Sequence, residues 1–157
     1  MAGRIERRLA ELGIALPARR LPTGSYLHAK RAGDLLYLAG QDPEFPDGTT
    51  GRGRIGDGLS VAEGYRQARQ VGITLIAAMR DALGDLDRVA EVVKVLGMVN
   101  AVPEFTEHPR VIDGCSDLFV EVFGERGRHA RSAVGMSSLP SGIPVEIEAI
   151  VAVTPGA

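Results

Sequence analysis

Residues 129–153 read HARSAVGMSSLPSGIPVEIEAIVAV, and this stretch decides the fold of the chain. Its pattern predicts two strands joined by a turn that contains proline and glycine. Alternate residues of the second strand form one unbroken apolar row, which comprises Val145, Ile147, Ala149, Val151 and Val153. A strand with such a row buries that face against a core, so Glu146 and Glu148 are expected to point to the opposite side.

The first of these strands carries a charged residue within the sheet. Arg131 shares one face of the strand with Ala133 and Gly135. An arginine on a sheet face needs a carboxylate or an anionic ligand as its partner. Two alternatives stay open: an ion pair with Glu146 or Glu148 on the strand expected to be its neighbour, or a clamp for a ligand. This grouping predicts a site for a small anion.

Three further strands are expected upstream. Residues 25–30 and 35–40 are predicted to form two strands around a turn at 31–34. Residues 89–99 form a long apolar run that predicts a third strand. Between the second and third strands, residues 41–59 are rich in glycine and proline and predict a loop, with a short edge strand near residues 50–55.

Two long helices are predicted between the strands. Ser60 and Glu63 form a capping box, and the helix that it opens is expected to end near Leu83, before Gly84. A second helix is expected to begin at Pro109 and to end at Gly124. Residues 3–12 predict a short amphipathic helix, which must dock on the rest of the chain because it is too short to be stable alone.

The order of these elements is helix, then β-β-α-β-α-β-β. Strands and helices do not alternate strictly, which favours an α+β domain with two helices packed on one face of a mixed sheet. The uncovered face would be free to meet another subunit. We expect residues 1–22 to form an N-terminal helix with an extended connection, and residues 23–157 to form a single domain.

Composition excludes several classes of protein. The chain has 157 residues, of which 45% are hydrophobic and 24% charged, as in ordinary globular domains. A net charge of -2 gives no bulk attraction for nucleic acid. No apolar run approaches the roughly 20 residues of a membrane span, and the N-terminus lacks the apolar core of a signal peptide. The lone Cys115 cannot form an internal disulfide, which fits the reducing environment of the cytosol, so we expect a cytoplasmic protein.

Other motifs carry little chemistry. Residues 51–56, GRGRIG, match the glycine pattern of dinucleotide-binding loops, but no strand precedes them and no helix follows directly. His28, His108 and His129 are too scattered for a local metal site, and Cys115 lies on an apolar helical face. No serine nucleophile motif is present. The sequence therefore predicts no metal and no organic cofactor.

The segment ARSAVG, followed by LP and VEIEAI at this spacing, resembles the C-terminal signature of the RidA/YjgF family of small enamine/imine deaminases, formerly called endoribonuclease L-PSP. The similarity extends over residues 25–153. The N-terminal extension and the region near residues 103–128 make the chain resemble a divergent branch of this family more than its deaminases. The resemblance implies a chorismate-mutase-like fold and a homotrimer with active sites in clefts between subunits.

The resemblance also implies roles for individual residues. Arg131 resembles the arginine that grips the substrate carboxylate, and Glu146 resembles the acidic residue that positions or activates water. Tyr26 resembles the tyrosine near the mouth of the site, and Gly40 and Ala133 fall at substrate-binding positions. At Ala39 and Ala133 the deaminases usually have serine and cysteine. Asp113 is the nearest counterpart of the family's helical asparagine.

The implied function is hydrolysis of small enamine or imine acids to 2-keto acids and ammonia, without a cofactor. Because Ala39 and Ala133 remove side chains that the deaminases usually have, a non-catalytic protein that binds small carboxylates is the alternative. Ribonuclease activity, implied by the older family label, is disfavoured because aromatic residues make up only 4% of the chain and the net charge is negative.

Overall fold

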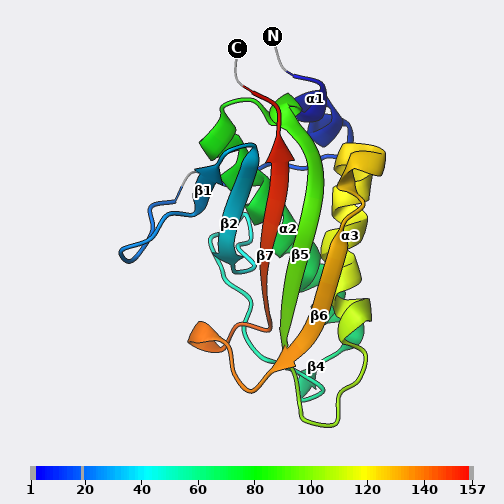
Figure 1. Ribbon diagram of the computed structural model, residues 1–157. Coiled ribbons are helices and arrows are strands. Elements are labelled where there is room, and N and C mark those ends of the chain that lie inside the picture. Colours follow the sequence, from blue (N-terminus) through cyan, green and yellow to red (C-terminus); the bar gives the residue numbers. More distant parts are fainter. Residues whose placement is uncertain (1–2, 19, 156–157) are drawn as a thin grey trace.

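The computed structural model describes residues 3–18 and 20–155. Residues 1, 2 and 19 of the predicted segment 1–22, and residues 156 and 157 of the predicted segment 23–157, therefore lie outside the described residues. Five strands form one sheet in the order β1-β2-β7-β5-β6. They are β1 (Ala29–Ala32), β2 (Leu35–Gln41), β5 (Val89–Asn100), β6 (Ala130–Met136) and β7 (Val145–Val153). Helices α2 (Val61–Leu83) and α3 (His108–Phe123) cover one face of this sheet (Figure 1). The predicted α+β architecture is confirmed.

Strand β7 forms the centre of the sheet. It pairs antiparallel with β2 on one side and with β5 on the other. Its predicted apolar row is buried, with no member more than 3% exposed. Glu146 and Glu148 alternate with that row and therefore lie on the opposite face, which we call the open face because no described helix covers it.

The expectation that the two C-terminal strands are neighbours is wrong. Strand β5 lies between β6 and β7, and β6 runs parallel to β5. The reason is the connection through α3: a strand, a crossover helix and a second strand place the two strands side by side and parallel. The chain then passes through residues 137–144, including the 3-10 helix Pro140–Gly142, to pair β7 with the other edge of β5.

Both long helices begin and end within one residue of the predicted positions. Ser60 Oγ accepts a hydrogen bond from the Glu63 backbone N–H, and Gly84 ends α2 with a φ of 74°. The reciprocal bond of a capping box does not form, because the Glu63 carboxylate binds Arg66 and Gln67. The helices pack closely at Gly114.

The N-terminal helix α1 (Arg4–Glu11) is docked as expected. Ile5 and Leu9 belong to the core, with 2% and 4% exposure. The carboxylate of Asp87, in the 3-10 helix Leu86–Arg88, accepts the backbone N–H groups of Arg4 and Ile5 at 2.7 and 2.8 Å. These bonds satisfy donors that the start of a helix leaves unpaired.

The remaining differences from prediction are local. Strand β1 is displaced toward the C-terminus of the predicted 25–30, because the hairpin turn is confined to Gly33 and Asp34, with Gly33 at a φ of 59°. The predicted edge strand at 50–55 is reduced to β3 (Arg54–Ile55), which pairs with β4 (Gly58–Leu59). A 3-10 helix, Gly124–Gly127, follows α3. Among the described residues, no helix is both long and apolar enough to cross a membrane.

Candidate functional site

Arg131 is held by helix α3. Its Nη1 donates to Ser116 Oγ at 3.0 Å, and its Nη2 donates to the Pro109 carbonyl at 3.3 Å and lies 2.8 Å from Asp113 Oδ1. The expected ion pair with Glu146 or Glu148 does not form. Arg131 projects from the face of β6 that meets α3, whereas both glutamates project from the open face of β7, beyond β5.

A guanidinium has five N–H groups, and the two hydrogen bonds and the ion pair use at most three of them. Within the described part of the chain, the other two have no protein partner. The Arg131 side chain is 24% exposed, so an anion can reach it from solvent. Arg131 is thus fixed in position while two of its donors stay available.

Ser116 links Arg131 to His129. The His129 Nδ1 lies 2.7 Å from the Gly127 carbonyl, which can only accept, so Nδ1 carries the proton. His129 Nε2 is therefore the acceptor for the Ser116 hydroxyl at 2.9 Å. Burial lowers the pKa of His129, with the charge of Arg131 as a further cause, and this favours the neutral ring. The sequence did not reveal this serine–histidine pair, because its members belong to different elements.

Glu146 lies on the open face beside Gly40. A methyl group added at Gly40 would lie 2.9 Å from Glu146 Oε2, so a larger residue there would displace the Glu146 side chain. Burial raises the pKa of the Glu146 carboxyl, and the negative charges of Asp42 and Glu148 raise it further. A carboxyl with a raised pKa is suited to proton transfer near neutral pH.

Within one chain, the predicted site residues therefore form two pairs, and Tyr26 stands apart from both. Arg131 and Ala133 lie on the helix-facing side of β6, where Ala133 packs against the core. Glu146 and Gly40 meet on the open face. Tyr26 lies before β1, where it is 48% exposed and its ring meets His28 edge-on at 5.8 Å. A single chain does not bring Arg131 to Glu146.

One group of carboxylates has the spacing of a metal site. Among the described residues, Glu6, Asp85 and Asp87 offer oxygen atoms within 4.8 Å of one another. Asp87 and Glu6 Oε1 already accept backbone N–H groups of Arg4, Ile5 and Leu86, whereas Glu6 Oε2 is buried without a partner among the described residues. The cluster thus joins α1 to the 3-10 helix and has a structural role.

Comparison with known proteins supports one family. Residues 6–144 match the family described as "YjgF/chorismate_mutase-like, putative endoribonuclease". The chain is 44% identical over 151 residues to Protein TCP17 of Trypanosoma cruzi, covering 96% of this chain and 94% of that protein. It is 29% identical over 144 residues to a 2-iminobutanoate/2-iminopropanoate deaminase of Dermatophagoides farinae, with coverage of 89% and 94%.

A solved structure agrees along nearly the whole chain. The protein Atu1372 of Agrobacterium tumefaciens, whose function is unknown, superposes with a TM-score of 0.87 at 43% identity and covers 96% of this chain and 94% of its own. This superposition includes the N-terminal region, which the sequence analysis interpreted as a feature of a divergent branch of the family. On its fold and on the extent of these matches, the chain belongs to the YjgF/RidA family.

Proposed function

We propose that this protein hydrolyses small 2-imino acids, or their enamine forms, to 2-keto acids and ammonia. The observation that carries the proposal is the fixed Arg131 guanidinium, in which two of five N–H groups lack a partner among the described residues. An arginine held in this way can bind a carboxylate with little loss of side-chain entropy. The similarity to an imine deaminase of Dermatophagoides farinae supports the choice of substrate class.

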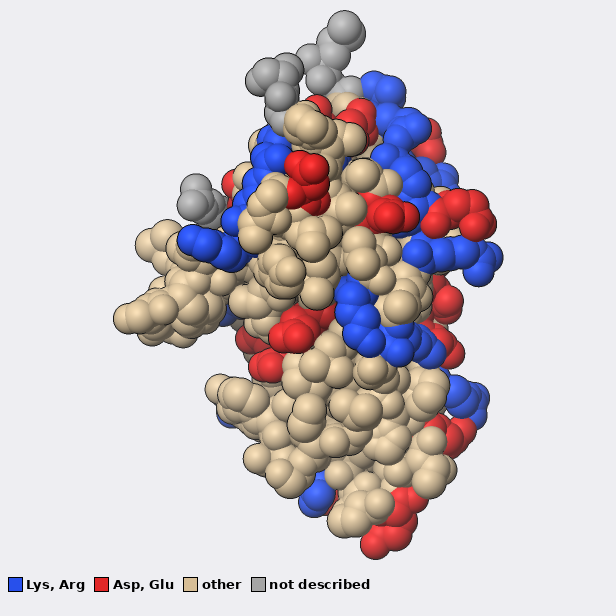
Figure 2. All heavy atoms as spheres, viewed as in Figure 1, with Lys and Arg blue, Asp and Glu red and all other residues tan. Residues whose placement is uncertain are grey.

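The complete site is proposed to form between subunits of a homotrimer. Arg131 and Ala133 of one subunit would then face Glu146, Gly40 and Tyr26 of the next. The open face of the sheet supports an interface, because Tyr37 and Val134 on it are 44% and 39% exposed. Figure 2 shows a broad uncharged area on the lower half of this face. Exposed apolar side chains such as those of Tyr37 and Val134 favour association.

The proposed reaction needs one anion clamp and one base. Arg131 holds the substrate carboxylate beside the electrophilic C=N carbon. The Glu146 carboxylate takes a proton from water as its oxygen bonds to that carbon. Return of that proton to nitrogen gives a carbinolamine. Glu146 then moves the proton of the new hydroxyl to nitrogen as the C=O bond forms and the C–N bond breaks, so that ammonia leaves and the 2-keto acid remains. No electron transfer is involved, and the step balances without a cofactor.

A second candidate function is binding of small carboxylates without turnover. Ala39 and Ala133 offer no polar side chain to a substrate, and Asp113 neutralises part of the charge on Arg131. A protein with these features would still hold a carboxylate in the same cleft. Saturable binding of 2-keto or 2-amino acids, with no acceleration of imine hydrolysis, would favour this function.

The deciding experiment measures hydrolysis of 2-iminopropionate and 2-iminobutyrate generated in situ by an amino-acid oxidase. We expect acceleration by the wild type and none by Arg131→Ala. Arg128→Ala is the matched control, because that arginine is exposed and pairs only with Glu125 among the described residues. Sedimentation should give a trimer for all three proteins. Equal activity of the wild type and Arg131→Ala would refute the clamp.

A further inference from the structure

A cavity of about 140 Å³ lies on the side of the molecule away from Arg131. Helix α2 contributes Thr74 and Ala78 to its wall, and β2 contributes Gln41. His28, immediately before β1, and the N-terminal connection at Pro17 complete it. Thr74 and Gln41 are nearly fully buried, at 5% and 6% exposure, although both are polar. Polar groups are seldom buried in this way unless they have hydrogen-bond partners.

The hydrogen bonds of Gln41 determine the tautomer of His28. Gln41 Nε2 donates to the Ala39 carbonyl at 3.1 Å, which fixes the orientation of the amide group. The same nitrogen lies 3.2 Å from His28 Nδ1, so Nδ1 must be the acceptor. In the neutral ring, His28 Nε2 therefore carries the proton. That Nε2 is buried and has no partner among the described residues.

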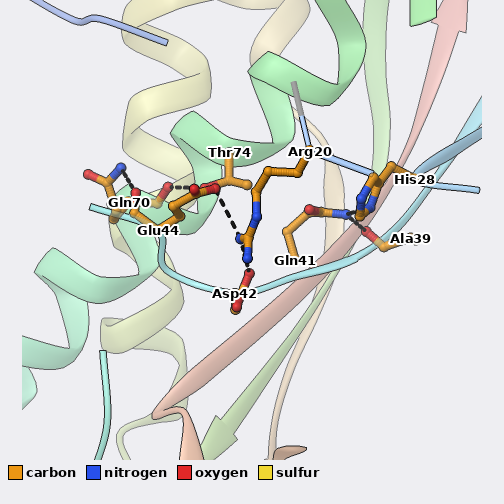
Figure 3. A network of polar contacts seen from close by, with 8 residues as sticks. All are labelled: Arg20, His28, Ala39, Gln41, Asp42, Glu44, Gln70 and Thr74. Atoms are coloured by element: carbon orange, nitrogen blue, oxygen red, sulfur yellow. Dashed lines mark hydrogen bonds and ion pairs between the residues drawn. The ribbon is translucent and has the colours of Figure 1, made fainter. Parts of the chain in front are cut away.

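The amide oxygen of Gln41 is the complementary group. Figure 3 shows it turned away from His28, and no described residue donates a hydrogen bond to it. His28 and Gln41 both line the cavity, and between them they hold one unused donor, Nε2–H, and one unused acceptor, Oε1. The donor lies just beneath the wall, with almost no surface open to water, so a ligand meets it only when the side chains around it shift. A buried donor without a partner is destabilising, and a ligand that supplies an acceptor would remove that cost.

The charged groups at this cavity are already paired. Arg20 lies between Asp42 and Glu44, at 3.5 and 3.0 Å from their carboxylates (Figure 3). Asp81 pairs with Arg80 at 3.0 Å. A charged ligand would have to displace one of these partners, so the cavity favours an uncharged one.

The rest of the wall is apolar and sets the size of the ligand. It includes Leu21, Pro22, Leu27, Ala77 and Ala82. The volume of the cavity is close to the roughly 150 Å³ of an engineered cavity that accepts benzene in another protein. We propose that this cavity binds an uncharged, ring-sized molecule with the C=O and N–H edge of a lactam or cyclic amide. The carbonyl would accept from His28 Nε2, and the N–H would donate to Gln41 Oε1.

This site is separate from the proposed deaminase site. Gln41 points toward α2, whereas its neighbour Gly40 meets Glu146 on the open face. The two sites therefore lie on opposite sides of β2. Binding at the cavity does not depend on whether imines are hydrolysed, and its test does not use that activity.

The test is an NMR titration of the full-length protein with 2-pyridone, benzene and benzoate as probes. We expect saturable binding of 2-pyridone, with amide shifts centred on residues 27–29, 41 and 74–78. Benzene should bind about tenfold more weakly because it leaves His28 unpaired, and benzoate should not bind. In the wild type, an imidazole ¹⁵N spectrum should show the Nε2–H tautomer of His28.

Two variants and one control make the result decisive. His28→Phe keeps a ring but removes the donor, and we expect about tenfold weaker binding of 2-pyridone. Ala78→Met fills the cavity and should abolish binding. Ala62→Met, at an exposed position of the same helix, should change nothing. Thermal melting confirms that each variant is folded.

Several results would overturn the proposal. They are no saturable binding of 2-pyridone, equal affinity for benzene, and unchanged binding by His28→Phe. Shifts centred on Arg131 or Glu146 would assign the probe to the other site. If Ala78→Met does not fold, the comparison of His28→Phe with the wild type still decides the outcome.

Discussion

Arg131 Nη2 lies 2.8 Å from Asp113 Oδ1, so helix α3 holds the arginine that we propose as the anion clamp. Asp113 is one turn along the helix from Ser116, the second side-chain partner of Arg131. This pairing orients the guanidinium, but it also places a negative charge where a substrate carboxylate must approach. The strength of substrate binding should therefore depend on Asp113.

Asp113→Asn is expected to strengthen substrate binding. The amide can keep one contact with Arg131 without the opposing charge, so KM for a 2-imino acid should fall by roughly two- to fivefold, as for other partly exposed ion pairs. Steady-state kinetics in the coupled oxidase assay provides the measurement. Asp117→Asn is the control, because Asp117 lies on the same helix as Asp113 but accepts its hydrogen bond from Tyr65 of α2. A higher KM for Asp113→Asn would mean that the carboxylate serves mainly to hold Arg131 in place.

The pH dependence of activity should report on Glu146. Burial and the charges of Asp42 and Glu148 raise the pKa of this carboxyl above its ordinary 4.5, and the proposed base is the deprotonated form. Activity should therefore fall on acidification at a pH above 4.5. Asp42→Asn removes one of the negative charges, so the acid limb of the kcat/KM profile should move to lower pH. Asp57→Asn, on an exposed turn, is the control. An unmoved limb in Asp42→Asn would exclude Glu146 as the titrating group.

Stability should decrease on mild acidification because of His129. Burial lowers the pKa of His129 in the folded protein below the ordinary 6.5, so the unfolded chain binds the proton more readily. The free energy of unfolding should then fall as pH drops from about 6.5 through the lower folded value. His129→Gln should show a smaller fall between pH 7.5 and 5.5 in urea denaturation. His108→Gln is the matched control. An identical pH dependence in the wild type and His129→Gln would contradict this linkage.

Close packing of the two long helices depends on Gly114. A methyl group added there would lie 2.0 Å from the Tyr65 carbonyl oxygen, and backbone cannot yield as a flexible side chain can. We expect Gly114→Ala to lower the free energy of unfolding by about 3 kcal/mol or more. Gly24→Ala, whose added methyl would make only ordinary contacts at 3.4 Å, should have little effect. Urea denaturation measures both, and a loss below about 1 kcal/mol for Gly114→Ala would show that the helices can separate at little cost.

Most elements of the fold could be predicted because their signals are local. The apolar row from Val145 to Val153 identifies a strand buried on one face. Ser60 identifies the start of α2, because its side chain caps the helix, and Gly84 identifies the end, because glycine readily adopts the left-handed conformation found there. Strand β1 was misplaced because the turn that defines it, at Gly33, depends on pairing with β2 and not on the residues of β1 alone.

The site was predicted less completely, for the same reason. The sequence selected Arg131 and Glu146 as candidates, but it placed their strands side by side, whereas β5 separates them. It gave no sign that Ser116 and His129 form a hydrogen bond, because one residue lies on a helix and the other precedes a strand. The unused polar atoms of His28 and Gln41 could not be predicted either, since the surroundings of these two residues depend on helix α2 and on the N-terminal connection.

By itself, the sequence determined which segments form strands and helices, which face of each is buried, and the family to which the chain belongs. Only the tertiary structure decided that β5 separates β6 from β7 and that Arg131 pairs with Asp113. Periodicity and capping act over a few neighbouring residues and can be read along the chain. Strand order and side-chain pairing depend on a helix crossover and on contacts between distant residues, which are established only when the core packs.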